Sequence, residues 1–152
     1  MSLQPDIAVY SPDQKLVLVV EIKGTPKSDD GWAAKLRRNL VAHGAVPAAP
    51  YFLLVVTDRI YLWKDVFSDE AVLPSYSEDT RTVLHKYLPK SKELDRRASV
   101  SESGLELAVR SWLGELTAKG GSVDLGDSVD WLRGSGLYEN IRTGEIRDEC
   151  QA

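Results

Sequence analysis

The first part of the chain is dominated by short, dense apolar runs that are rich in β-branched residues. Residues 6–10 are followed by a turn-rich stretch and then by the run 15–23, a pattern that predicts a β-hairpin. The segment 16–20 is apolar at both alternating positions, which is typical of a central strand covered on both faces. Residues 51–56 and 60–64 flank a tight turn and predict two further strands.

A helix is expected between the hairpin and the third strand. Asp29 or the next residue can cap its start, and Gly44 supplies its end. Trp32, Leu36 and Leu40 recur at helical spacing and form an expected core face. A helix between two buried strands implies a right-handed crossover, so the two strands that it connects should run parallel in one mixed sheet.

Beyond residue 65 the pattern becomes helical. Ser75 and Glu78 have the spacing of a capping box, and later apolar residues recur at helical intervals. We therefore expect an α/β core over residues 1–89, a charged linker over 90–101 and a helical C-terminal appendage over 102–152. Such short helices cannot easily bury their own apolar positions, so the appendage should pack on the core or form a homodimer through its helices.

The net charge of −4 argues against a protein that coats nucleic acid non-specifically, but the charge is unevenly distributed along the chain. Residues 15–64 carry +4, whereas residues 1–14 carry −2 and residues 65–152 carry −6. No apolar run approaches the roughly 20 residues that span a bilayer, and no signal peptide begins the chain, so we expect a cytoplasmic protein. The single Cys150 excludes an internal disulfide and a cysteine-cluster metal site.

The hairpin brings three chemically active residues to one end of the sheet. A turn centred on residues 13 and 14 places Asp6 opposite Glu21, and the period-two pleat puts Lys23 on the same face. Two close carboxylates repel unless a proton or a cation lies between them, and oxygen ligands suit Mg²⁺ or Mn²⁺. Such an ion could activate water against a phosphodiester, with Lys23 orienting that water or stabilising the developing charge.

Pro5-Asp6, followed after a hairpin by Glu21-Ile22-Lys23, a helix and an apolar strand, resembles the PD-(D/E)xK nuclease superfamily. The resemblance covers about residues 4–64 and implies a restriction-endonuclease-like fold. It also implies that Asp6, Glu21 and the Ile22 carbonyl bind metal and that Lys23 acts on the attacking water.

The chain departs from this family pattern in two places. The first helix of the family, which often adds an acidic ligand, has almost no room before Pro5, and Met1-Ser2-Leu3 is interpreted as an added remnant that replaces an upstream element. The glutamine frequent on the following helix is absent. The nearest substitutes are Lys35, Arg38 and Asn39, which share one helical face.

The leading hypothesis is therefore a Mg²⁺-dependent endonuclease that hydrolyses DNA phosphodiesters. The expected nucleic-acid contacts are Lys27, Lys35, Arg38 and Asn39. The alternative is a catalytically inactive interaction or scaffold protein with the same fold. In that alternative, Glu21 and Lys23 are a solvated pair, and Lys35, Arg37 and Arg38 form an ordinary solvated helix face.

Overall fold

The computed structural model describes residues 5–25, 27–44, 46–68, 70–88, 101–118 and 129–148. The expected linker therefore lies outside the described residues except for Ser101. The strands are β1 (Ile7–Tyr10), β2 (Leu16–Ile22), β3 (Tyr51–Val55), β4 (Arg59–Lys64), β5 (Tyr76–Asp79) and β6 (Glu145–Arg147). The helices are α1 (Asp30–Ala42), α2 (Thr80–Leu84), α3 (Glu102–Thr117), α4 (Val129–Gly134) and α5 (Leu137–Ile141).

The described strands form one mixed sheet in the order β5-β4-β3-β2-β1-β6. The pair β2 and β3 is parallel, and α1 connects the two strands, as the sequence predicts; every other pairing in the sheet is antiparallel. Asp29 caps α1 because its carboxylate accepts the N–H of Trp32 at 2.8 Å. The predicted mixed α/β sheet with a crossover helix is confirmed at this level.

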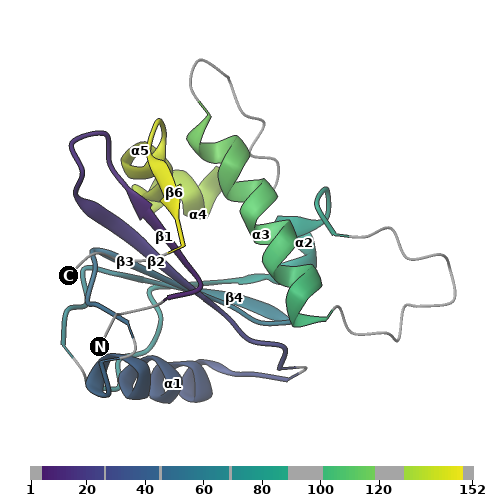
Figure 1. The fold of residues 1–152 in the computed structure, drawn as a ribbon. Coiled ribbons are helices and arrows are strands. Elements are labelled where there is room, and N and C mark those ends of the chain that lie inside the picture. The colour runs from purple at the N-terminus through teal and green to yellow at the C-terminus, as the bar shows by residue number, and fades with distance from the viewer. Residues whose placement is uncertain are drawn as a thin grey trace, which may run out of the picture.

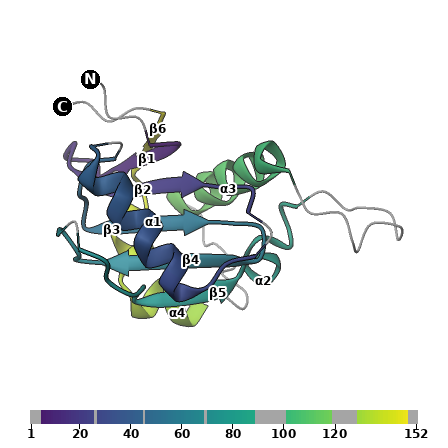
Figure 2. The same cartoon turned by 90° about the horizontal axis from the view of Figure 1, so that it is seen from below.

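The sheet is covered on both faces, which explains the apolar residues at both alternating positions of its central strands. Helix α1 crosses one face, and α3, α4 and α5 lie on the other (Figures 1 and 2). In β2, Leu18 and Val20 contribute to the core under α3, whereas Val19 contributes to the core under α1. In β3, the same division separates Leu53 from Leu54.

The expected helix cap at Ser75 and Glu78 is wrong. Ser75 lies directly before β5 and its N–H donates to the carbonyl of Leu62, whereas Glu78 lies within β5 and pairs with Ile60 of β4. The cap of α2 is instead Asp79, whose carboxylate accepts the N–H of Thr82 at 3.1 Å. Pairing with β4 overrides the local capping pattern, because it satisfies the hydrogen-bonding groups of several backbone positions and a helix cap satisfies fewer.

The C-terminal region contributes a strand as well as helices. β6 pairs with β1, a feature that the expected all-helical appendage did not include. The approach is close: a Cβ on Gly144, just before β6, would lie 2.6 Å from the Tyr10 carbonyl oxygen, so this position requires glycine.

Helix α3 packs against the sheet of its own chain. Trp112 belongs to the appendage that was expected to pack on the core or on a second subunit; it is only 4% exposed and lies 6.1 Å from Trp131, measured between ring centroids. The need for a second subunit to cover this residue therefore disappears, and a homodimer stays a prediction. Among the described residues, no helix is both long and apolar enough to cross a bilayer.

Arg37 is a core residue and does not belong to a solvated helix face. Its side chain is 1% exposed and lies over the rings of Phe52 and Trp63. Its two terminal nitrogens donate to the carbonyls of Val66, at 2.5 Å, and Ser68, at 3.1 Å. The guanidinium thus fixes the segment after β4 against α1 and the sheet.

Replacing Arg37 should therefore be costly. Arg37→Ala leaves two carbonyls without their donor and opens a cavity, so the free energy of unfolding should fall by about 3 kcal/mol. Urea denaturation monitored by tryptophan fluorescence measures this change. Arg38→Ala, at the exposed next position, is the matched control and should change it by less than about 0.5 kcal/mol. Equal effects of the two substitutions would contradict a role of Arg37 in the core.

Candidate functional site

Asp6 and Glu21 meet at the carboxyl end of β2. Ile7 pairs with Val20, so one step further along the same register Asp6 stands opposite Glu21, as the sequence predicts. The Asp6 carboxylate accepts the backbone N–H of Ile22 at 2.7 Å, which fixes it at the end of the strand. Glu21 follows Val19 by two positions, so its side chain emerges on the face of the sheet that α1 covers.

The pKa of Glu21 is affected by its burial and by both of the other predicted residues. Glu21 is only 5% exposed, and burial is the largest cause that raises its pKa from 4.5 to about 7. The negative charge of Asp6 raises this pKa further, while the positive charge of Lys23 lowers it. Both charges therefore act on the Glu21 carboxylate, and the positive charge of Lys23 only partly offsets the repulsion by Asp6.

The Ile22 main chain is oriented consistently with its expected role. In a strand, the N–H and C=O of one residue point to the same side, so the Ile22 carbonyl faces the side from which Asp6 approaches. Within the described ranges, no group of three or more His, Cys, Asp or Glu side chains is placed to hold a metal ion. The oxygen donors predicted from the sequence are the Asp6 and Glu21 carboxylates and this carbonyl, and Mg²⁺ sites commonly complete such a set with water and substrate phosphate.

The expected nucleic-acid contacts are all exposed but differ in their distance from the site. Lys27 lies in the loop between Lys23 and α1, and Lys35, Arg38 and Asn39 lie on the outer side of α1. Helix α1 runs back from the carboxyl end of β2, so Asn39 lies about 13 Å along the axis from Asp30, at 1.5 Å per residue. Lys27 is therefore the basic residue of this set that is closest in the chain to the site.

A second polar cluster holds the loop after Lys23. Ser28 donates from its backbone N–H and its hydroxyl to the Asp58 carboxylate, at 3.2 and 2.9 Å. The Ser28 and Tyr61 hydroxyl oxygens are 2.6 Å apart. Tyr61 pairs with Leu54, which in turn pairs with Glu21, so this cluster lies in the same row across the sheet. The sequence indicated a turn at Asp58, but its partner 30 residues away had no local signal.

Helix α3 also contacts this end of the sheet, although the sequence analysis did not include it in the site. Glu102 accepts the backbone N–H of Gly24 at 3.0 Å, and Arg110 donates to the Asp6 carbonyl at 3.1 Å. The available signal was the spacing of Glu102, Glu106 and Arg110 by four residues, which places three charges on one helical face. That spacing does not say what the face contacts.

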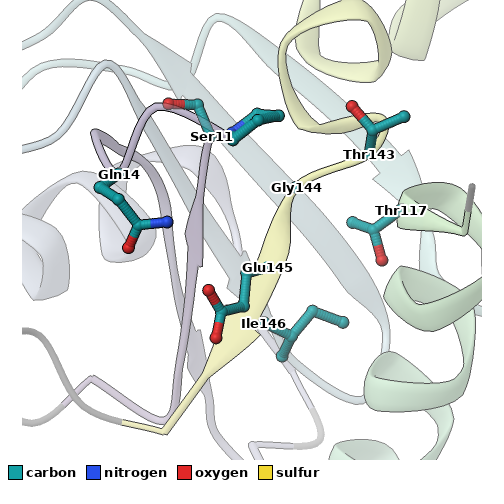
Figure 3. A pocket seen from close by; sticks show the side chains of 8 residues that line it. Ser11, Gln14, Thr117, Thr143, Gly144, Glu145 and Ile146 are labelled. Carbon is teal, nitrogen blue, oxygen red and sulfur yellow. The ribbon is translucent and has the colours of Figure 1, made fainter.

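A separate cleft of about 780 Å³ lies at the other end of the hairpin. It is lined by Ser11 and Gln14 of the β1–β2 turn, Thr117 at the end of α3 and Thr143 before β6 (Figure 3). The cleft contains none of the predicted site residues. The carboxylates and this cleft are therefore distinct features.

The fold and the site together define a mixed α/β protein in which two interacting carboxylates lie at the carboxyl end of a central strand, with Lys23 directly after that strand. No family model, curated protein or solved structure matches the chain. The function must consequently be argued from the site itself.

The raised pKa of Glu21 predicts a pH-dependent stability. In the unfolded chain Glu21 ionises near its usual pKa of 4.5, but in the folded chain it ionises near 7, so the folded state binds more protons between these values. Wild-type stability should therefore fall as the pH rises through this window.

Glu21→Gln removes this ionisation, so the variant should gain up to about 3 kcal/mol relative to wild type between roughly pH 4 and pH 8, at about 1.4 kcal/mol per pKa unit. Urea denaturation of both proteins across this range measures the difference. Parallel stability curves for the two proteins would show that Glu21 ionises normally in the fold.

Proposed function

We propose that this protein is a metal-dependent nuclease that hydrolyses DNA phosphodiesters, with a PD-(D/E)xK site made of Asp6, Glu21 and Lys23. The observation that carries the proposal is the buried Glu21 carboxylate beside Asp6, with the ammonium of Lys23 nearby. Three such groups at the end of a covered strand supply ligands for a cation and a positive charge for a phosphate. A restriction-endonuclease-like assignment of the sheet is part of this proposal.

The two carboxylates fit a divalent cation on electrostatic grounds. Burial and like charge both disfavour ionised Glu21, which is the arrangement that a bound cation relieves. Asp6, Glu21 and the Ile22 carbonyl would hold Mg²⁺ or Mn²⁺ through hard oxygen atoms. When bound, such an ion would polarise the phosphodiester and lower the pKa of a bound water.

The other residues have roles that follow from their charge and position. Lys23 would orient the attacking water or stabilise negative charge that develops on the phosphate. Lys27 in the loop and Lys35 in the first half of α1 are exposed, and they would attract the nucleic-acid backbone. Arg38 and Asn39 would contact a nucleic-acid strand that extends along α1.

Metal should stabilise the folded protein through the two carboxylates. Millimolar Mn²⁺ or Mg²⁺ should raise the melting temperature of the wild type, because the ion binds the folded state preferentially. Asp6→Ala and Glu21→Ala should abolish this increase, whereas Asp13→Ala, in the hairpin turn at the other end, should retain it. A metal-induced increase that survives both site substitutions would favour the inactive scaffold protein.

Cleavage should depend on Lys23. With Mn²⁺ and linear, circular and single-stranded DNA as substrates, the wild type should cut at least one, and Lys23→Ala should be slower by about 100-fold or more, the usual cost of removing a group that stabilises a charged transition state. Lys15→Ala, an exposed lysine in the hairpin turn, is the matched control and should cut at the wild-type rate. If wild type and Lys23→Ala are equally inactive on all three substrates, the catalytic proposal fails.

A further inference from the structure

Arg110 of α3 connects the C-terminal region to the beginning of the proposed site. Its Nη2 donates to the backbone carbonyl of Asp6 at 3.1 Å, across 104 residues of sequence. Asp6 lies immediately before β1, which begins at Ile7. The contact therefore holds the main chain at Asp6, the proposed metal ligand, directly before the first strand of the sheet.

The guanidinium of Arg110 is itself held in place by two carboxylates. Nη1 lies 2.7 Å from an Asp148 oxygen, and Nε lies 3.5 Å from a Glu106 oxygen one helical turn earlier. With the Asp6 carbonyl, three acceptors from three segments surround one planar group. Arginine suits this arrangement because its donors point in fixed, divergent directions, whereas lysine presents a single flexible ammonium.

We propose that Arg110 is a positioning residue for Asp6. Arg110 acts on Asp6 through the main chain: it binds the carbonyl of that residue, whereas the Asp6 carboxylate accepts the N–H of Ile22. Fixing that carbonyl limits how far the Asp6 side chain moves from the Ile22 N–H and from Glu21. The α3 layer thus sets the separation of the two carboxylates, in addition to covering the sheet.

Glu102 of α3 makes a similar backbone contact next to Lys23. It accepts the N–H of Gly24 at 3.0 Å, directly after Lys23, and belongs to the same face of α3 as Arg110. Helix α3 therefore binds the main chain at Asp6, the first of the three site residues, and directly after Lys23, the last of them. This inference rests on the proposed function for its catalytic meaning, but the position of Asp6 can be measured without metal or substrate.

The test is hydrogen exchange of two neighbouring amides in the metal-free protein. The Ile22 N–H reports the position of Asp6, because its acceptor is the Asp6 carboxylate, and the Lys23 N–H is an internal reference, because its acceptor is the Val55 carbonyl. Arg110→Ala should raise the exchange rate of Ile22 relative to Lys23 by about fivefold or more, through local opening. Asp6→Ala gives the upper limit of this effect.

Two further variants separate positioning from general destabilisation. Arg142→Ala removes an arginine ion-paired with Glu139 on α5 and should leave the ratio of the two exchange rates unchanged. Arg110→Lys keeps the charge and most of the packing, so it serves if Arg110→Ala unfolds, and it should raise the ratio by less. An unchanged ratio in folded Arg110→Ala or Arg110→Lys overturns the inference.

A Mn²⁺ titration followed by melting temperature distinguishes this failure from failure of the proposed function. If the wild type binds Mn²⁺, Arg110→Ala should require about tenfold more Mn²⁺ for half of the effect, the scale usual for residues that orient a metal ligand. If the wild type shows no Mn²⁺ effect but the exchange ratio rises in Arg110→Ala, the positioning of Asp6 stands and the nuclease proposal falls. Unchanged Mn²⁺ affinity in Arg110→Ala contradicts a role in the metal site.

Discussion

The parallel pairing of β2 with β3 is the constraint on which the rest of the structure depends. A parallel pair needs a crossover, and α1 supplies it on one face of the sheet. The apolar residues of β2 and β3 that point to the other face need a second cover, which α3, α4 and α5 provide. The C-terminal region is thus required by the composition of two early strands, and β6 extends the same sheet beyond β1.

This two-sided cover gives the candidate site its electrostatic character. Glu21 is one residue from the end of a strand that both layers shield, so its carboxylate loses most of its hydration while Asp6 stands beside it. Lys23 follows two residues later and compensates only part of the charge. Keeping the two carboxylates together lowers the free energy of unfolding, and pairs of this kind are concentrated at functional sites in proteins.

The sequence predicted the features that depend on neighbouring residues. Strand β2 follows from its dense apolar run, the crossover helix from helical spacing and its capping residues, and the position of Asp6 opposite Glu21 from the place of the hairpin turn. Arg37 was misassigned because helical spacing cannot show that the carbonyls of Val66 and Ser68 are available to a buried guanidinium. Strand β6 and the Arg110 contact were missed for the same reason: their partners, β1 and Asp6, lie more than 100 residues away, as the 104-residue separation of Arg110 from Asp6 shows.

The pairing of β6 with β1 also has a consequence for biosynthesis. The outer edge of β1 is completed by a strand that the ribosome makes last among the described elements, and Arg147 of β6 bonds to Gln14, 133 residues earlier. At typical rates of about 5 to 20 residues per second, the nascent chain exposes that edge for several seconds or longer. During this interval the unpaired backbone of β1 is a template for pairing with other chains. Chaperone protection of the emerging polypeptide would therefore matter most before β6 leaves the exit tunnel.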